Sequence, residues 1–563
     1  MFIINLLFPP SVYAIISVYR ESGGVEMSIS KYSLIDVPSG DGVHTKVAGA
    51  KGEKYVYKYT HYFRNAEGKP RNKAILIGKI DVKTGKMEPN SNYYELFKVA
   101  PGMPDTAVWD YGYSYLALKC CHDMGLSACL NEVFGGQAMD IIASAAYIVR
   151  EGSSMDAIDD WLERTLVPGY FKSLDSQSIS RLFGSISPSK THEFFKKWIA
   201  VARMGENVCY DVTSISSYSR TMTDVEYGYN RDGEDLPQFN IGMFCDESSK
   251  LPLYFNRYNG SLTDKTNLSY VLENAGAVGL KDIKFVVDGG FISEECIRNL
   301  SIHSKAFTIG IPAYLGIAVE MLKSHSQGIE KYANKLSDKD IYCVDKHFEY
   351  YGASGRLMLF YDPMNHAQLC NEMSERIRSF SAELAALKRY PASKLKRYTQ
   401  YFRITKHADD SGFDFAVDAD KVDLSRQYKG FFLIFSTDNG ISHDDILYHY
   451  RAKDAAEKLF DQLKIDMQGA RIRTHNEQTT DGKAFVLFIA LIIRSYTMGK
   501  LKKHLAEKST SLKKVFNQLT NIAVITTGGK ARFTKALTKE QKSILAAFNA
   551  ADDILKSVET CLR

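Results

Sequence analysis

The sequence predicts an α/β fold in which helices cover a mixed sheet. Its 563 residues allow several domains and a large core, and 45% hydrophobic and 24% charged residues are typical of a globular protein. From residue 207 onward, apolar strand-like segments alternate with segments of helical periodicity, which favours a mixed α/β layer. The net charge of +5 permits an anionic partner without requiring one.

The N-terminal residues 1–26 are apolar but do not have the pattern of a signal peptide or a spanning helix. They lack a basic n-region, and Pro9 and Pro10 interrupt the run. Gly23 and Gly24 precede Met27, and their codons can contain a ribosome-binding sequence. We therefore expect residues 1–26 to be a translated leader that is not part of the fold, with Met27 as the true start.

The nine cysteines show no CxxC pair and no zinc-ligand spacing. We expect reduced, packing thiols in a cytoplasmic protein. The apolar run at residues 484–493 is too short to span a bilayer, so we expect a buried helix and no membrane contact.

Two regions precede the expected sheet. Residues 27–106 contain β-forming segments around a turn, with lysine and arginine interleaved with aromatic residues. That composition suits a DNA-binding β-hairpin, although a soluble edge hairpin would have it too. Residues 107–203 show apolar residues at helical spacing, which predicts a helical region.

Two aspartates follow apolar strand segments of the expected sheet. Asp211 follows NVCY, and Asp288 follows KFVV and precedes Gly289 and Gly290. Strand ends present side chains to a cleft, and glycines let a substrate backbone approach closely. The ordinary alternatives are that Asp288 shapes a turn and that Asp211 caps a neighbouring element.

The segment YRAKDAAEKLFDQLK, residues 450–464, predicts one helix with a polar stripe. At about 100° per residue, Tyr450, Lys453, Glu457 and Lys464 fall on the same side. A solvated, mixed-charge face would look the same. Together with Asp211 and Asp288, however, Glu457 completes a set of three carboxylates that could bind two divalent cations for phosphodiester chemistry. Carboxylates suit Mg²⁺, for which Mn²⁺ can substitute, and Tyr450, Lys453 and Lys464 would hold DNA phosphates.

These motifs resemble those of DDE transposases of bacterial insertion sequences. In one branch of that family the pattern is Tyr-x2-Arg-x3-Glu-x6-Lys, and the present chain matches its spacing, with Lys453 in place of the arginine. Lysine keeps the charge but loses the planar, two-pronged grip on phosphate. YDVTS and VVDGGF resemble the two Asp-bearing strands, and the resemblance runs from about residue 55 to about residue 500.

The resemblance implies a ribonuclease-H-like catalytic domain with a mostly β insertion between the second Asp and the Glu. The 169 positions between Asp288 and Glu457 support an insertion independently, because ordinary connections are far shorter. The expected division is: leader 1–26; basic β-hairpin region 27–106; helical DNA-binding region 107–203; core 204–317; insertion 318–428; core 429–500; C-terminal helical region 501–563.

The resemblance also implies a function. We expect a Mg²⁺-dependent transposase, with two ions held by Asp211, Asp288 and Glu457. It would bind the inverted-repeat ends of an insertion sequence, cleave the DNA and join the 3′-hydroxyl ends to target DNA. Its partners would be double-stranded DNA and a second copy of the chain in the DNA complex. The alternatives are another two-metal nuclease without strand transfer and a non-catalytic DNA-binding derivative.

Overall fold

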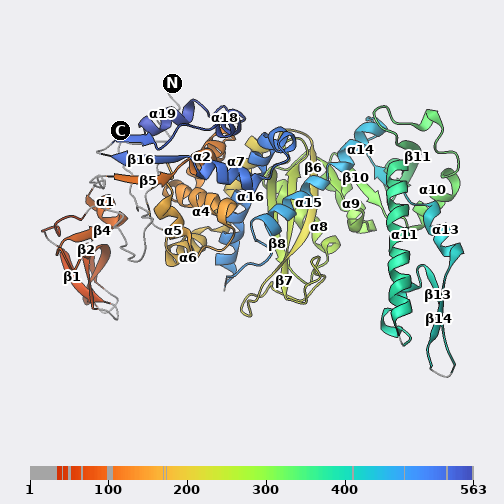
Figure 1. Ribbon diagram of the computed structural model, residues 1–563, viewed down its shortest axis with the longest axis horizontal. Helices are drawn as coiled ribbons and strands as arrows, with labels where there is room; N and C mark the ends of the chain where they lie inside the picture. The colour runs from red at the N-terminus through yellow and green to blue at the C-terminus, as the bar shows by residue number, and fades with distance from the viewer. Residues whose placement is uncertain are drawn as a thin grey trace.

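The computed structural model describes residues 34–560 except residues 41, 49–51, 65–67, 98–105, 169, 171, 173, 388, 409–410, 475 and 528–529. The expected leader and the start at Met27 lie outside the described residues. Figure 1 shows the N-terminal sheet at one end of the long axis, the helical region and the large sheet in the middle, and an elongated helix-and-hairpin segment at the other end.

A small antiparallel sheet begins the described chain, with strand order β1-β2-β3-β4. Its elements are β1 (Val43–Ala48), β2 (Glu53–Arg64), β3 (Pro70–Ile80), β4 (Met87–Pro89) and the helix α1 (Ser91–Phe97). The core of this sheet is small, since Val56, Ile77 and Met87 are its fully buried apolar side chains. Most of the long basic and aromatic residues of β2 and β3 therefore remain at the surface.

The helical region packs around one long, apolar helix. Its elements are α2 (Gly112–Asp123), α3 (Leu126–Phe134), α4 (Ala138–Glu151), α5 (Ile158–Arg164), α6 (Ser176–Ser185) and α7 (Pro188–Ala202). The long helix is α16 (Glu477–Glu507), which contacts α2, α4 and α6 and contains the apolar run at residues 484–493. By length and composition α16 could cross a membrane, but 72% of its apolar window is buried inside the protein, as expected for a core helix.

The C-terminal region is not purely helical, which corrects the sequence-based expectation. Its elements are α17 (Leu512–Thr520), β16 (Ala523–Thr527), β17 (Lys530–Phe533), α18 (Lys539–Ala546) and α19 (Asp553–Thr560). Strand β16 pairs with β17 and with β5 (Thr106–Asp110), where Val524 faces Trp109. The β-branched AVITT segment forms a strand because a distant part of the chain supplies its partner.

The predicted α/β layer is confirmed as a large mixed sheet of eight strands in the order β11-β12-β15-β10-β9-β6-β7-β8. The strands are β6 (Asn207–Ser216), β7 (Gln238–Asp246), β8 (Pro252–Asn259), β9 (Lys284–Val287), β10 (Ala306–Ile311), β11 (Tyr342–Tyr350), β12 (Ala353–Tyr361) and β15 (Phe431–Ser436). The helices are α8 (Asp264–Ala277), α9 (Glu294–His303), α10 (Gly316–His325), α14 (His443–Arg451) and α15 (Asp454–Asp461). All residues of β7 and β10 are buried, which explains their continuous apolar sequences.

The expected insertion over residues 318–428 is neither mostly β nor wholly separate from the sheet. Strands β11 and β12 lie in this range, yet they extend the large sheet beyond β15. The remainder contains α11 (Pro363–Ala386), α12 (Leu395–Tyr398), β13 (Phe402–Lys406), β14 (Phe413–Val417) and α13 (Ala419–Gln427). Its longest element is the 24-residue α11, whereas β13 and β14 have five residues each.

Helical periodicity explains why α11 dominates this segment. Met373, Ile377, Phe380 and Leu384 recur at helical spacing and pack with Tyr398 in a small core of their own. The segment leaves the sheet after Tyr361 and returns at Phe431, and these two residues face each other in the antiparallel pair of β12 and β15. The part of the expected insertion that stands outside the sheet is therefore residues 362–430, closed at its base by neighbouring strands, and we call this segment the insertion below.

This geometry predicts that the insertion can be replaced by a tight turn. Because Tyr361 and Phe431 are directly opposite, an Asn-Gly pair in place of residues 362–430 closes a two-residue hairpin. We expect the shortened protein to keep the circular dichroism signature of a mixed α/β fold and to unfold cooperatively on heating, with the intact chain as reference. Loss of cooperative unfolding would show that the large sheet depends on the insertion.

Candidate active site

Strand register brings the two predicted aspartates side by side. Strands β6 and β9 are parallel, and their last paired residues are Tyr210 and Val287. Asp211 and Asp288 are the residues that directly follow this last pair. Asp211 does not end its strand, contrary to the sequence-based expectation, because β6 continues to Ser216 through pairing with β7. The parallel ladder ends there, and that is what places Asp211 at the edge with Asp288.

Two glycines let the backbone close around Asp288. A Cβ on Gly289 would lie 2.9 Å from the carbonyl oxygen of Gly310, so β9 and β10 approach closely at this point. A Cβ on Gly310 would lie 2.1 Å from the hydroxyl oxygen of Tyr450. Gly310 thus makes room for the Tyr450 hydroxyl, which donates a hydrogen bond to Asp288 Oδ1 at 3.4 Å. Sequence reasoning missed Gly310, since its role is visible only across the sheet.

The helix that carries the predicted polar stripe is broken, which corrects the expectation of one continuous helix. Helix α14 ends at Arg451, and α15 starts at Asp454 with Lys453 as its N-cap residue. Ala452 and Lys453 keep right-handed backbone angles, but the N–H groups of Ala455 and Ala456 bond to the carbonyls three residues earlier. Because this turn is tightened, Tyr450 is rotated relative to Glu457. Lys453 points to the space between Asp288 and Glu457.

Lys453 contacts two of the three predicted carboxylates. Its ammonium lies 3.1 Å from Asp288 Oδ1 and 3.3 Å from Glu457 Oε1, and it also lies over the ring of Tyr450. The Lys453 side chain is 17% exposed, whereas Asp288 and Glu457 are 49% and 56% exposed. A nearly buried cation is thus shared by two accessible carboxylates.

The charges of the site shift the pKa values of its groups in opposite directions. Burial opposes the charge of Lys453, but Asp288, Tyr450 and Glu457 outweigh that effect and raise its pKa. Burial acts to raise the pKa of Asp288 as well, yet Lys453 and the backbone N–H groups of Gly289 and Gly290 lower it. Burial also raises the pKa of Tyr450, to about 12, so its phenol stays protonated.

Asp211 is the carboxylate that the protein compensates least. Burial raises its pKa to about 6, and the negative charges of Glu457 and Asp288 add to the effect. The N–H of Val212 donates to its Oδ1 at 2.8 Å, and the guanidinium of Arg231 acts in the opposite direction. Arg231 was not predicted from the sequence, because it comes from the loop between β6 and β7 and pairs with Asp264. Asp211 therefore sits where an additional cation would be stabilised.

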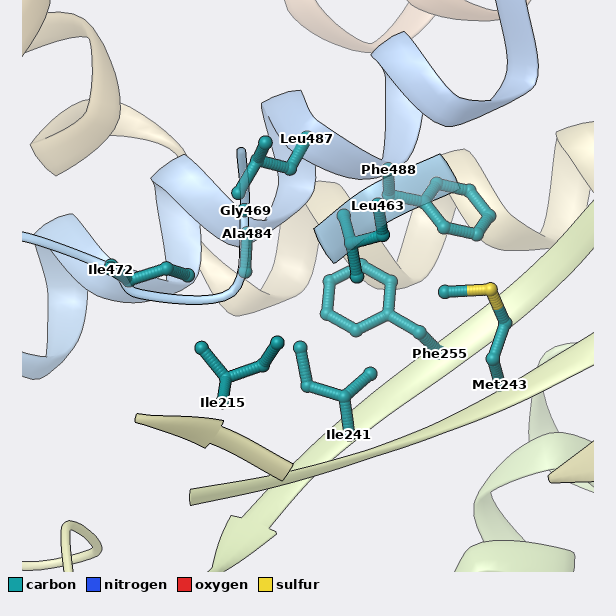
Figure 2. Close-up of a pocket in the computed structure, with 10 residues that line it drawn as sticks. All are labelled: Ile215, Ile241, Met243, Phe255, Leu463, Gly469, Ile472, Ala484, Leu487 and Phe488. Atoms are coloured by element: carbon teal, nitrogen blue, oxygen red, sulfur yellow. The ribbon is translucent and has the colours of Figure 1, made fainter. Parts of the chain in front are cut away.

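Lys464 lies apart from the cluster that contains Lys453. It falls in a short π-helical turn, residues 462–466, and its ammonium pairs with Asp232 Oδ2 at 2.5 Å. The neighbouring Leu463 fixes this turn against the sheet: Figure 2 shows Leu463 and Phe488 facing Ile241 and Met243 across a tightly packed apolar pocket. Since Leu463 is held inward, Lys464 is directed to a different wall of the protein.

The residues present fit a hard divalent cation by their chemistry. All three predicted ligands are carboxylates, and the ammonium between Asp288 and Glu457 shows that this place accepts a positive charge. Their positions differ from a closed site: among the described residues, no three acidic, histidine or cysteine side chains are close enough to hold an ion as they stand. Binding of an ion by all three carboxylates would require the Lys453 ammonium to withdraw from Asp288 and Glu457. Glu457 is exposed and therefore accessible for that rearrangement.

Comparison with known proteins identifies the domain. Residues 204–493 match the model of the transposase DDE domain, a range that includes Asp211, Asp288, the broken helix and the π-helical turn. No curated protein is similar enough to count as a relative. Among solved structures, the chain is similar to piggyBac transposase in a synaptic complex with hairpin DNA, at 14% identity over 72% of this chain and 69% of that one. The TM-score of 0.32 is too low to show a shared fold.

The match covers more than half of the chain and contains every site residue predicted from the sequence. The chain belongs to the family of transposases with a DDE domain.

Proposed function

We propose that this protein is a metal-dependent DNA transposase that cleaves the ends of an insertion sequence and joins them to target DNA. The observation that carries the proposal is the Lys453 ammonium shared by Asp288 and Glu457 beside the undercompensated Asp211. Three carboxylates so close together repel one another, and bound cations would relieve that repulsion. The branch marked by the Tyr-Arg-Glu-Lys signature remains part of the proposal, with Lys453 as its departure.

A ribonuclease-H-like catalytic domain is the second part of the proposal. Strands β8, β7, β6, β9 and β10 are neighbours in that order; β6, β7 and β8 pair antiparallel, and β9 pairs parallel with both β6 and β10. Two adjacent central strands supply Asp211 and Asp288, and a later helix supplies Glu457. This placement supports the assignment of these three residues as the catalytic and metal-binding set.

In this proposal Asp211, Asp288 and Glu457 hold two Mg²⁺ ions, and Mn²⁺ can replace them. When bound, such a pair activates the attacking oxygen and stabilises the leaving oxygen of a phosphodiester. Lys453 first balances the charge of Asp288 and Glu457 and then, displaced from them, is free to bind a DNA phosphate. The protonated Tyr450 keeps Asp288 oriented through its hydroxyl. The half-buried surroundings strengthen each of these charge interactions.

The N-terminal sheet supports binding of the element ends. The rings of His44 and Tyr59 stack 4.4 Å apart, and Tyr62 and Phe63 are 70% and 52% exposed. Lys58 and Lys73 line a surface hollow of the same sheet together with Tyr59. Basic groups beside exposed aromatic rings can hold a phosphate backbone. We propose that this sheet and the helical region bind the inverted repeats.

A cytoplasmic location is part of the same proposal. The eight cysteines among the described residues are free and buried, in accord with the reduced thiols of a cytoplasmic protein acting on DNA. The apolar α16 serves the core, as its burial supports.

The isosteric amides test the three carboxylates. Asp211→Asn, Asp288→Asn and Glu457→Gln should each abolish cleavage of labelled element-end DNA and leave binding nearly intact, because the amide keeps shape but loses charge. Glu294→Gln, on the surface of α9, is the matched control and should cleave normally. Wild-type cleavage by any two of the three site variants would refute the assignment.

The same variants should change stability in opposite directions without metal. The raised pKa of Asp211 means that its charge is disfavoured in the folded state, so Asp211→Asn should raise the free energy of unfolding at neutral pH by up to about 3 kcal/mol. The lowered pKa of Asp288 means that its charge is favoured, so Asp288→Asn should reduce stability. Chemical denaturation measures both. A loss of stability in Asp211→Asn would support a merely structural role instead.

Lys453 should act through its charge. Lys453→Arg should retain cleavage, because it keeps the positive charge and introduces the arginine of the related transposases. Lys453→Ala should lose cleavage and flatten the slope of log affinity against log salt by roughly one unit, as for one lost phosphate contact. Lys464→Ala should flatten the slope by a similar amount, although Lys464 lies apart from Lys453. Unchanged slopes for both alanine variants would show that neither side chain meets DNA.

The active complex should contain at least two copies of the chain. Joining two ends to one target requires two active sites in a fixed relation, and the chain has one acidic triple. A twofold dimer is the simplest arrangement. Light scattering of the complex with paired ends should give the mass of two chains. A fully active complex with one chain per pair of ends would contradict this, and cleavage without joining would favour a simple nuclease.

A further inference from the structure

A basic cleft, separate from the acidic candidate site, lies between the helical region and the core. The cleft has a volume of about 940 Å³. Its walls are the loop at residues 153–156, one side of α6, the segment at residues 468–474 and the start of α16 from Asn476. None of Asp211, Asp288 and Glu457 lines it, whereas Lys464 does. The cleft is therefore a separate surface that shares one wall with the segment following the active-site helix.

Lys483 is the unusual residue of this cleft. It lies in the second turn of α16, is 6% exposed and lines the cleft. No described residue forms a hydrogen bond or an ion pair with its ammonium. Burial, and then the positive charge of Arg473, lower its pKa to about 8. A mostly buried lysine whose ammonium has no counter-charge is costly, so the cleft favours an anion beside it.

The charged groups facing the cleft leave positive charge in excess. Lys464 is paired with Asp232, and Arg471 with Glu234. Asp156, the remaining acid, accepts a hydrogen bond from Ser154 at 2.7 Å and keeps its negative charge, so that Lys483 and Arg473 together exceed it by one positive charge. Arg473 is exposed and forms no ion pair among the described residues, although its charge lowers the pKa of Asp156.

The start of α16 adds to this preference for anions. Asn476 caps the helix by accepting the N–H of Thr479 at 2.8 Å, and both residues line the cleft. The 31-residue helix directs the positive end of its dipole there. Its one acidic first-turn residue, Glu477, accepts hydrogen bonds from Thr223 instead, at 2.6 Å from the hydroxyl. Hydroxyl groups of Ser176 and Ser180 on α6 line the opposite wall.

We propose that this cleft binds backbone phosphates of a DNA strand, with Lys483 and Arg473 as the anion-binding groups. A phosphodiester supplies the negative charge that Lys483 lacks, and the volume of about 940 Å³ has room for more than a single ion. Lys464, on the wall shared with the active-site segment, continues the basic path toward the catalytic carboxylates. The identity of the ligand as DNA rests on the proposed function; the binding of a phosphate group does not.

The test measures DNA binding without cleavage. Fluorescence anisotropy follows a labelled duplex and a labelled single strand over a range of salt concentrations, in the Glu457→Gln background. Lys483→Met and Arg473→Ala should each weaken binding roughly tenfold, as for one lost charged hydrogen bond, and flatten the salt slope by about one unit. Lys483→Arg should retain most of the affinity. Lys323→Met, at an exposed position of α10 that has no role in the proposed DNA-binding surfaces, is the control and should change neither quantity.

Thermal unfolding separates binding from folding. Lys483→Met removes a buried charge that has no partner, so its melting temperature should equal or exceed that of the parent. Wild-type affinity and slope in both Lys483→Met and Arg473→Ala would overturn the proposal. Binding of inorganic phosphate or ATP that is lost in Lys483→Met, together with DNA binding that Lys483→Met leaves unchanged, would instead identify a site for a free phosphate compound and would also overturn it.

These outcomes are distinguishable from failure of the proposed function. If the wild-type protein cleaved no DNA, the transposase assignment would fail, yet a loss of DNA affinity in Lys483→Met would still establish the cleft as a phosphate-binding site. If cleavage occurred and the two cleft variants bound normally, only the cleft proposal would fail.

Discussion

Repulsion among three carboxylates is the constraint on which the candidate site depends. Two of them are balanced by one ammonium, that of Lys453, at 3.1 and 3.3 Å. The third, Asp211, keeps a raised pKa because burial and the two neighbouring charges act in the same direction. A protein that maximised its stability would not retain such an arrangement, and functional sites are where that cost is usual. In the proposed function, divalent cations relieve the repulsion and Lys453 becomes available for phosphate.

The scaffold imposes this arrangement through packing that lies outside the site. Parallel pairing of β6 with β9 ends just before Asp211 and Asp288, so both side chains emerge at one edge. Gly310 lets Tyr450 reach Asp288, and the short turn after α14 directs Lys453 between the carboxylates. Further along the chain, Leu463 is buried against the sheet (Figure 2). The π-helical turn carries the next residue, Lys464, to the wall of the basic cleft. One continuous segment, residues 443–476, thus connects the acidic site with the proposed phosphate-binding cleft.

Local patterns in the sequence were sufficient for the main strands of the large sheet and for the neighbouring positions of Asp211 and Asp288. An apolar run followed by Asp288 and two glycines is a short-range signal, and the spacing of Tyr450, Lys453 and Glu457 places them together even though the helix is broken. Long-range packing was not predictable in this way. The break after Arg451 and the π-helical turn involve residues with good helix propensity, so nothing local marks them. Lys483 has the sequence context of a buried apolar helix, and its position beside a cleft depends on α6, about 300 residues earlier in the chain. The strand character of residues 523–527 depends on a partner, β5, near the start of the described chain.

The central claim is that Asp211, Asp288 and Glu457 form one site for divalent cations. It is tested most directly by titrating the DNA-free protein with Mn²⁺ and following the free ion by electron paramagnetic resonance. The account predicts uptake of up to two ions per chain, lost in Asp288→Asn and Glu457→Gln and kept in Glu294→Gln. Lys453→Ala should bind at least as tightly as the wild type, because the competing ammonium is gone. Equal uptake by the wild type and the Asp288 and Glu457 variants would contradict the account.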